Sequence, residues 1–245
     1  NNRTPIVGNG FLDDTTHLEH KAELANFVLK HDPTQAPLLT RKAFRQHGSI
    51  SQKALILTWY LLLVRNVSIE ATTLYQITDT YVEFDIGAIK GADIPDLKLK
   101  VYCNCFVPAE DPQALKSAEF CPLHGPYAVH HVHWPPTKQQ IKDVLEVFRI
   151  SGHSPRITGA CEIQRRCHYD KQFAKVATNR IVNYLFVWKS PFSDKLRKRY
   201  SRQWQKLQTA EDTIPIYSII LQINLLNLQP FQYHIFPTVS KEEMD

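Results

Sequence analysis

Apolar residues recur with helical spacing in the first quarter of the chain. The pattern predicts one helix over residues 17–29 and, within residues 40–64, a short helix over 41–46, a turn at Gly48 and a second helix. Two short helices around a glycine turn are similar in spacing to a helix-turn-helix. The second helix is apolar on all sides between residues 55 and 63, so we expect it to lie in the core and not in a DNA groove.

Alternation with a period of two replaces the helical spacing after residue 61. Short segments of alternating apolar and polar residues are separated by turns, among them Thr78-Asp79-Thr80. The expected strands lie around residues 67–69, 74–77, 81–86 and 97–101. Several short strands joined by tight turns are typical of an antiparallel sheet, as in a small sandwich or an OB-like barrel.

A helix with clear start signals follows at residue 137. Two prolines precede Thr137, Thr137 and Gln140 match a capping box, and apolar residues follow at i, i+3, i+4 and i+7. Beyond it the pattern predicts a loop over 152–159, strands within 173–188, a helix from about 190 to 207 and two strands over 214–236.

These elements predict an α+β fold: a mainly antiparallel sheet, OB-like or sandwich-like, with flanking helices and a zinc-ribbon-like insertion. Residues 1–50 are expected to form an N-terminal arm and helical segment. Residues 51–245 are expected to form a single mixed domain with the insertion around residues 103–133. The longest apolar run, residues 54–64, is far shorter than the roughly 18 residues that span a bilayer, so no membrane span is expected.

Cysteine and histidine gather in the middle of the chain. Cys103-Asn-Cys105, fifteen residues and then Cys121-Pro-Leu-His124 form a CxC…CxxH pattern. Thiolate and imidazole are the ligands that Zn²⁺ prefers, and a CxxH turn lets both side chains converge on one tetrahedral ion. On a strand, Cys103 and Cys105 would share a face. We therefore predict a zinc site with these four ligands, closed and structural.

The remaining cysteines and nearby histidines leave alternatives for one ligand of this site. The candidates are His130, His131, His133, Cys161, Cys167 and His168. His131 and His133 also suggest a metal-dependent hydrolase, although the carboxylate that a cupin-type motif requires is replaced by Lys138. Nucleotide-binding and hydrolase motifs are absent from the sequence, so an enzyme has no positive support.

Charge is distributed unevenly along the chain. The net charge is +5, but residues 149–206 contain fourteen Lys and Arg against three acids, which leaves the remainder acidic. Such basic density attracts phosphate backbones, and interleaved aromatic rings can stack on unpaired bases. The predicted nucleic-acid-binding residues are Arg165, Arg166, Lys171, Lys175, Arg180, Lys195, Arg197, Lys198, Arg199, Arg202, Tyr200 and Trp204.

The combination of short strands, a CxC…CxxH insertion and a basic, aromatic C-terminal third resembles the zinc-ribbon OB-folds of replication and telomere single-stranded-DNA-binding proteins. The resemblance is architectural and covers residues 55–190. It implies a non-enzymatic protein that binds single-stranded DNA or RNA. The alternative is a cellular or viral protein-interaction adaptor whose zinc-stabilised module shapes a partner surface and whose basic helix binds an acidic partner. An odd number of cysteines with a CxC pair favours an intracellular location, and nucleic-acid binding favours the nucleus.

Overall fold

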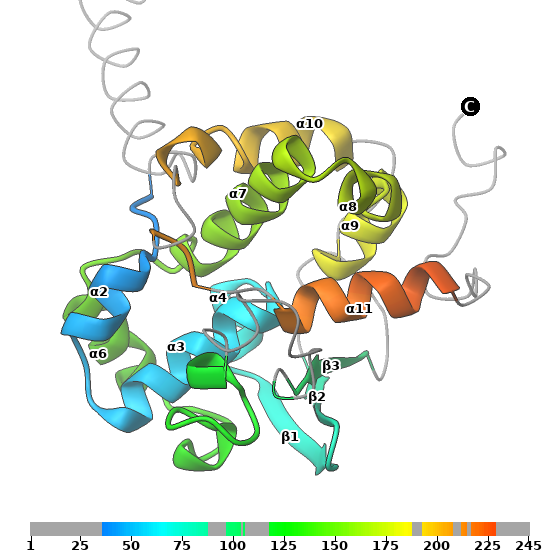
Figure 1. Cartoon of the computed structure of the whole chain (residues 1–245). Coiled ribbons are helices and arrows are strands. Elements are labelled where there is room, and N and C mark those ends of the chain that lie inside the picture. The colour runs from blue at the N-terminus through cyan, green and yellow to red at the C-terminus, as the bar shows by residue number, and fades with distance from the viewer. Residues whose placement is uncertain are drawn as a thin grey trace, which may run out of the picture.

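The structure, a computed structural model, describes residues 36–87, 97–103, 105, 118–187, 193–207, 212–214 and 217–228. Over these residues the fold is α+β, with helices packed against a three-stranded antiparallel sheet (Figure 1). The predicted arm and the predicted helix at 17–29 lie outside the described residues, as does the chain beyond Leu228.

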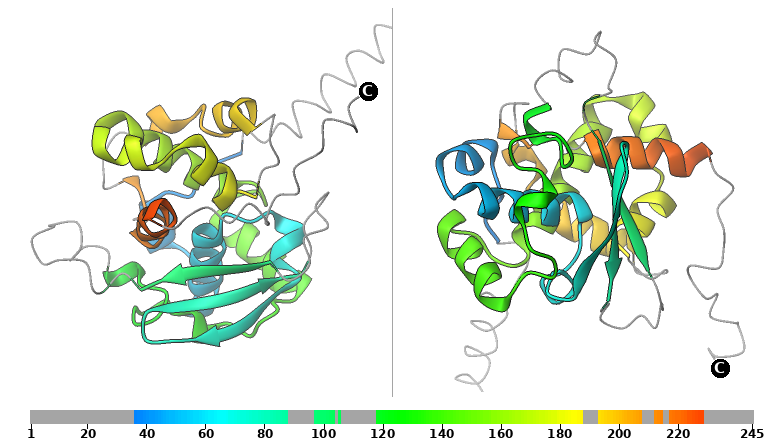
Figure 2. Two further views of the ribbon diagram at one scale, coloured as in Figure 1. Left: turned by 90° about the vertical axis from the view of Figure 1, so that its right-hand side faces the viewer. Right: turned by 90° about the horizontal axis from the view of Figure 1, so that it is seen from below.

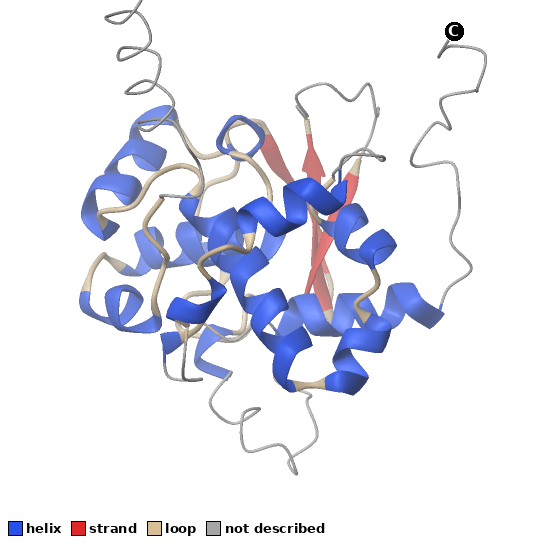
Figure 3. Ribbon diagram, turned by 90° about the horizontal axis from the view of Figure 1, so that it is seen from above, coloured by secondary structure: helices blue, strands red, loops and turns tan. Residues whose placement is uncertain are grey.

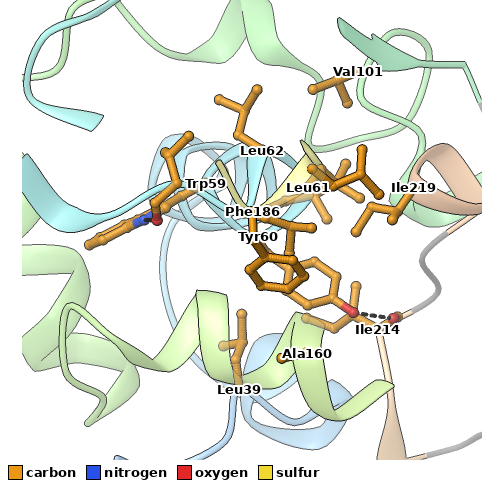
Figure 4. Close-up of a cluster of buried hydrophobic side chains, with 14 of the residues drawn as sticks. Leu39, Trp59, Tyr60, Leu61, Leu62, Val101, Ala160, Phe186, Ile214 and Ile219 are labelled. Carbon is orange, nitrogen blue, oxygen red and sulfur yellow. Dashed lines mark hydrogen bonds between the residues drawn. The ribbon is translucent and has the colours of Figure 1, made fainter. Parts of the chain in front are cut away.

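Helix α3 (Ile50–Leu62) forms the centre of the core, as its apolar sequence predicts. A capping box starts it: the Ser49 side chain accepts from the Gln52 amide, and the Gln52 side chain accepts from the Ser49 amide. Every residue from Ala54 to Leu62 is buried. Figure 4 shows this cluster, in which the Tyr60 hydroxyl donates to the carbonyl oxygen of Ile214 at 3.0 Å. A helix buried on all sides cannot read a DNA groove.

The sheet contains the strands β1 (Thr72–Ile77), β2 (Tyr81–Ile86) and β3 (Lys98–Tyr102) in the order β1-β2-β3. Three of the four strands predicted between residues 67 and 101 are thereby confirmed. On β2 and β3 alternate residues are buried, which places one face against the core. The three described strands form an open sheet, so they do not close into the OB-like barrel that the sequence suggested.

Helices replace several of the other predicted elements. The predicted strand at 67–69 is the short helix α4 (Asn66–Ile69), and the predicted strands in 173–188 are α8 (Lys171–Val176) and α9 (Asn179–Leu185). The side chains of Asp170 and Thr178 cap α8 and α9, respectively, by accepting backbone amides of the first turn. These caps start a helix in each of the two segments, and the pattern of apolar residues on which the strand prediction rested does not show them.

Two further predictions in the C-terminal half are wrong. The predicted loop at 152–159 is the first half of α7 (Ser154–Tyr169), and the predicted strands at 214–236 correspond, where described, to α11 (Tyr217–Leu228).

The predicted helix at 190–207 is α10 (Ser193–Tyr200), followed by a turn and the 3-10 helix η4 (Trp204–Lys206). The predicted helix at 137 is confirmed as α6 (Lys138–Phe148), with its capping box.

The elements form layers around α3. Helices α7 to α10 lie together on the side of the molecule away from the sheet, and α11 runs between this helical layer and β3 (Figures 1 and 2). Helices α2 (Arg41–Gln46) and α6 pack at one end of the molecule, away from α8 and α9 (Figure 1). Seen from above, the helices lie over the sheet (Figure 3). None of the described helices is both long and apolar enough to cross a membrane.

Candidate metal centre and basic surface

The four predicted metal ligands converge in space. The ligand atoms of Cys103, Cys105, Cys121 and His124 all lie within 4.8 Å of one another, so they could hold a metal ion. Cys103 Sγ lies 3.6 Å from Cys121 Sγ and 3.3 Å from His124 Nδ1, and Cys121 Sγ lies 3.9 Å from His124 Nδ1. A sulfur separation of 3.6 Å is far longer than the bond of about 2.05 Å in a disulfide. Neither these two cysteines nor Cys105 forms a disulfide in the described structure.

Cys103 is held by the end of the sheet. It follows β3 directly, and its amide donates to the carbonyl oxygen of Thr80 at 2.8 Å, which continues the pairing between β2 and β3 by one residue. The amide of Cys105 then donates to Cys103 Sγ at 3.3 Å. This bond turns the chain back, so that the second cysteine of the CxC pair lies beside the first.

Cys121 and His124 are positioned by an anchored turn. The 3-10 helix η2 (Ala118–Phe120) precedes Cys121, and the fully buried Phe120 ring packs 5.4 Å from the Phe44 ring of α2. The Gly125 amide donates to the carbonyl oxygen of Cys121 at 3.1 Å. A Cβ atom at residue 125 would lie 2.7 Å from that oxygen, so this turn requires glycine. The His124 amide donates to Cys121 Sγ at 3.4 Å.

Burial of the thiols favours their protonated form. Burial raises the pKa of Cys103, and burial together with the neighbouring Cys121 thiol raises the pKa of Cys105 to about 12. The Cys105 amide that donates to Cys103 Sγ acts in the opposite direction on the pKa of Cys103, because it stabilises a thiolate. A positive ion would offset the cost of placing several thiolates together.

The alternative ligands lie elsewhere in the described chain, where the four residues above form the one cluster able to hold a metal. His130 and His131 belong to the 3-10 helix η3 (Val129–His131), and His133 follows it; all three are exposed. Cys161 is buried in α7 and lies 3.5 Å from the carbonyl oxygen of Tyr200. Cys167 and His168 lie near the end of α7. Of all these candidates, the four predicted ligands are the ones that the described structure brings together, while residues 106–117 between their two halves lie outside the described residues.

Exposed basic residues spread over the helical layer. Lys171 and Lys175 lie on α8, Arg180 on α9, and Lys198 and Arg199 on α10. All five are exposed, as are Arg202 and Lys206 beyond α10. No acidic side chain is among those described between residues 171 and 207. These helices therefore present a strongly positive surface, which is called the basic surface below.

Other predicted contact residues are less accessible. The Arg165 side chain is buried and donates to Glu162, with Nε 2.6 Å from Oε2, and Tyr200 is 7% exposed. Arg166 and Arg197 are half-buried, and the side chain of Lys195 lies outside those described. Arg165 and Tyr200 belong to the interior of the fold, so neither reaches a ligand on the surface. The burial of Arg165 and Tyr200 could not be predicted from their residue types, because arginine and tyrosine often lie at the surface.

Comparisons of the chain with protein-family models, with curated protein sequences and with solved structures find no match. Its function must therefore be inferred from its own residues.

Proposed function

We propose that this chain is a non-enzymatic protein that binds single-stranded nucleic acid and is stabilised by a structural zinc ion. The basic surface is the observation that carries the first part of the proposal. Seven exposed lysines and arginines cover α8, α9, α10 and the turn that follows, without a described acid among them. Phosphate groups neutralise such a surface and release condensed counterions, which favours binding.

Zinc is supported by the geometry of the cysteine and histidine cluster. In a tetrahedral zinc site, ordinary bond lengths place sulfur atoms about 3.8 Å apart and sulfur and nitrogen about 3.5 Å apart. The separation of 3.6 Å between the Cys103 and Cys121 sulfurs is close to the first value, and the separations of 3.3 and 3.9 Å from these sulfurs to His124 Nδ1 bracket the second. Three thiolates and one imidazole would fill all four positions, which leaves none for a substrate. We assign the ion a structural role at the end of β3, in an insertion of zinc-ribbon type.

Salt-dependent binding tests the proposed function. Labelled oligothymidylate and oligouridylate are titrated with the purified protein at several salt concentrations. If about five phosphates are neutralised, the affinity falls roughly 100-fold between 50 and 200 mM salt, because single strands release about 0.7 counterions per contact. Absence of binding at low salt, or an affinity that does not change with salt, would overturn the proposal.

A matched pair of variants assigns the binding to the basic surface. The triple variant Lys198→Glu, Arg199→Glu, Arg202→Glu changes exposed residues only and should weaken binding by at least tenfold and flatten the salt dependence. The control variant Lys42→Glu, Lys138→Glu, Lys142→Glu changes the same number of exposed basic residues, on α2 and α6. Equal losses in both variants would show that net charge, and not this surface, determines binding.

The strand β1 favours the adaptor as a second candidate function. Among the described residues β1 pairs only with β2, and Tyr75 and Ile77 on it are 55% and 53% exposed. Exposed edge strands can pair with a strand of another protein. This function predicts that a partner protein co-purifies, that Ile77→Lys abolishes the association, and that oligonucleotides do not bind at moderate salt.

A further inference from the structure

Three aromatic rings meet at the surface where α7 ends. The ring centroids of His168 and Trp204 lie 4.8 Å apart with a 40° angle between their planes, and those of His168 and Tyr169 lie 5.0 Å apart at 84°. The contact joins α7 to η4, which packs beside it. We call these three residues the ring cluster.

The ring cluster is open to solvent at one end. Trp204 is half-buried and packs against the hydrophobic core, whereas His168 is exposed and Tyr169 is 64% exposed. Tyr169 is thereby the most exposed of the large hydrophobic residues described. The Tyr169 ring contacts the His168 ring and has most of its surface in water, and a tyrosine can accept another planar ring without a cost for ordering several flexible bonds.

Exposed basic residues lie close to the ring cluster in the sequence. The exposed Lys171 follows Tyr169 by two residues, and the exposed Arg202 and Lys206 lie two residues before and after Trp204. The nearby acid, Asp170, is engaged locally: Oδ1 accepts the amides of Gln172 and Phe173 at the start of α8, and Oδ2 lies 4.0 Å from Arg166. Exposed basic side chains therefore outnumber the acid among the sequence neighbours of these rings.

We infer that the ring cluster is a stacking site for an unpaired base, with Tyr169 as the ring that the base contacts, while Lys171, Arg202 and Lys206 contact the adjoining phosphates. The inference rests on the proposed function and specifies it. It replaces the buried Tyr200 as the predicted stacking residue and adds Tyr169 and His168 to Trp204. Stacking needs a base whose face is accessible, so the site selects single strands over duplexes. It accepts either DNA or RNA, because every base has such a face.

The test combines a ring deletion with a base deletion. Binding of oligothymidylate and of an abasic oligomer of the same length is measured for the wild type, Tyr169→Ala and Tyr169→Phe. Tyr169→Ala should weaken oligothymidylate binding roughly 5- to 150-fold, the range for loss of one stacked base. Tyr169→Phe should bind as the wild type does. On the abasic oligomer, Tyr169→Ala should cause no loss, because there is no base to stack.

Two controls separate stacking from folding and from charge. Tyr75→Ala removes another exposed tyrosine, 55% exposed on β1, and should leave binding unchanged. The salt dependence of Tyr169→Ala should keep the wild-type slope, because no phosphate contact is lost. Thermal melting of each variant confirms that the fold is intact.

The possible failures point to different conclusions. If Tyr169→Ala binds oligothymidylate as tightly as the wild type while the triple variant at residues 198, 199 and 202 binds weakly, the stacking site is wrong and the proposed function stands. Equal affinity of the wild type for duplex and single strand, or an equal loss for Tyr169→Ala on the abasic oligomer, also overturns the stacking site. If the wild type binds no oligonucleotide, both proposals fail.

Discussion

Arg156 Nη1 donates to the carbonyl oxygen of Leu63 at 3.1 Å, at the residue where α3 ends. Nη2 of the same guanidinium donates to the carbonyl oxygen of Phe186, where α9 ends. Burial lowers the pKa of Arg156 to about 9, so the interior opposes its charge. The negative ends of two helices compensate for that cost. One buried arginine thus joins α7, α3 and α9.

Replacement of Arg156 by methionine should destabilise the fold by about 2–4 kcal/mol, because two buried carbonyl groups lose their donor. Arg156→Lys should recover part of this loss, since one ammonium group retains the charge but lacks the fork that reaches both oxygens. Urea unfolding monitored by circular dichroism measures both variants. An unchanged midpoint for Arg156→Met would contradict the proposed bridge.

The buried ion pair between Glu162 and Arg165 should show strong coupling. Their side chains are 4% and 10% exposed, and both guanidinium contacts are short, at 2.6 and 2.7 Å. Either Glu162→Leu or Arg165→Met leaves a buried charge alone and should cost about 3–5 kcal/mol. The double variant should lose much less than the sum of the two, by about 2 kcal/mol or more. Additive losses in urea unfolding would show that the two side chains act independently.

The same pair predicts a pH effect with a definite sign. Burial raises the pKa of Glu162 above its ordinary value of 4.5, and the Arg165 bonds oppose that rise. In Arg165→Met the guanidinium that lowers the pKa of Glu162 is gone, so the pKa of Glu162 in the folded protein rises further. A carboxyl with a raised folded pKa loses stabilising free energy as pH rises from the unfolded to the folded pKa. Unfolding at several pH values from 4.5 upward should therefore show a steeper fall for Arg165→Met than for the wild type.

Metal analysis should find one zinc ion per chain. Cys121→Ser and His124→Ala should each lose it, whereas Cys167→Ser, a cysteine outside the cluster, should retain it. With free zinc at about a thousand times its Kd, binding adds about 4 kcal/mol to the free energy of unfolding. Chelation should then lower the melting temperature by about 10 °C. A chain that is purified without metal and melts unchanged with chelator would disprove the assignment.

Gly125→Ala should weaken the metal centre without changing a ligand. The new Cβ would lie 2.7 and 2.9 Å from the carbonyl oxygens of Cys121 and Glu119, and backbone atoms cannot yield as a flexible side chain can. We expect a clear loss of zinc affinity in a chelator competition. Gly152→Ala is the matched control, because its Cβ would meet only the Asn66 side chain, at 3.1 Å. Equal zinc affinity in the two variants would mean that the turn tolerates a side chain.

The sequence predicted the elements whose signals are local. The alternation of β2 and β3 and the capping box at Thr137 each arise within a few residues, and both are found in the structure. The convergence of the CxC and CxxH pairs was also predictable, because cysteine and histidine at such spacings are the side chains that a zinc ion draws together. The pairing of Cys105 with the other ligands depends on the turn after Cys103, which the spacing alone could not establish.

The elements that were predicted wrongly depend on distant contacts. The Gly159 that suggested a loop lies inside α7, where an added Cβ would come 2.2 Å from Leu63 Cδ2; the glycine allows α7 and α3 to approach closely. In α11, β-branched residues suggested strands, but Ile219 and Ile223 are buried in a helix that packs on β3. Burial against other elements outweighs β propensity in such segments.

Two neighbouring amides on one peptide segment connect the metal centre to the rest of the fold. The Tyr102 amide donates to the Ser218 hydroxyl of α11 at 2.6 Å, and the next amide, that of Cys103, donates to Thr80. An event at the Cys103 sulfur, such as oxidation or loss of the ion, therefore acts one residue away from the attachment of α11. The rate of hydrogen exchange at the amides of residues 102 and 103 should therefore be slow with metal bound and faster without it. This rate would report metal occupancy without any ligand on the basic surface.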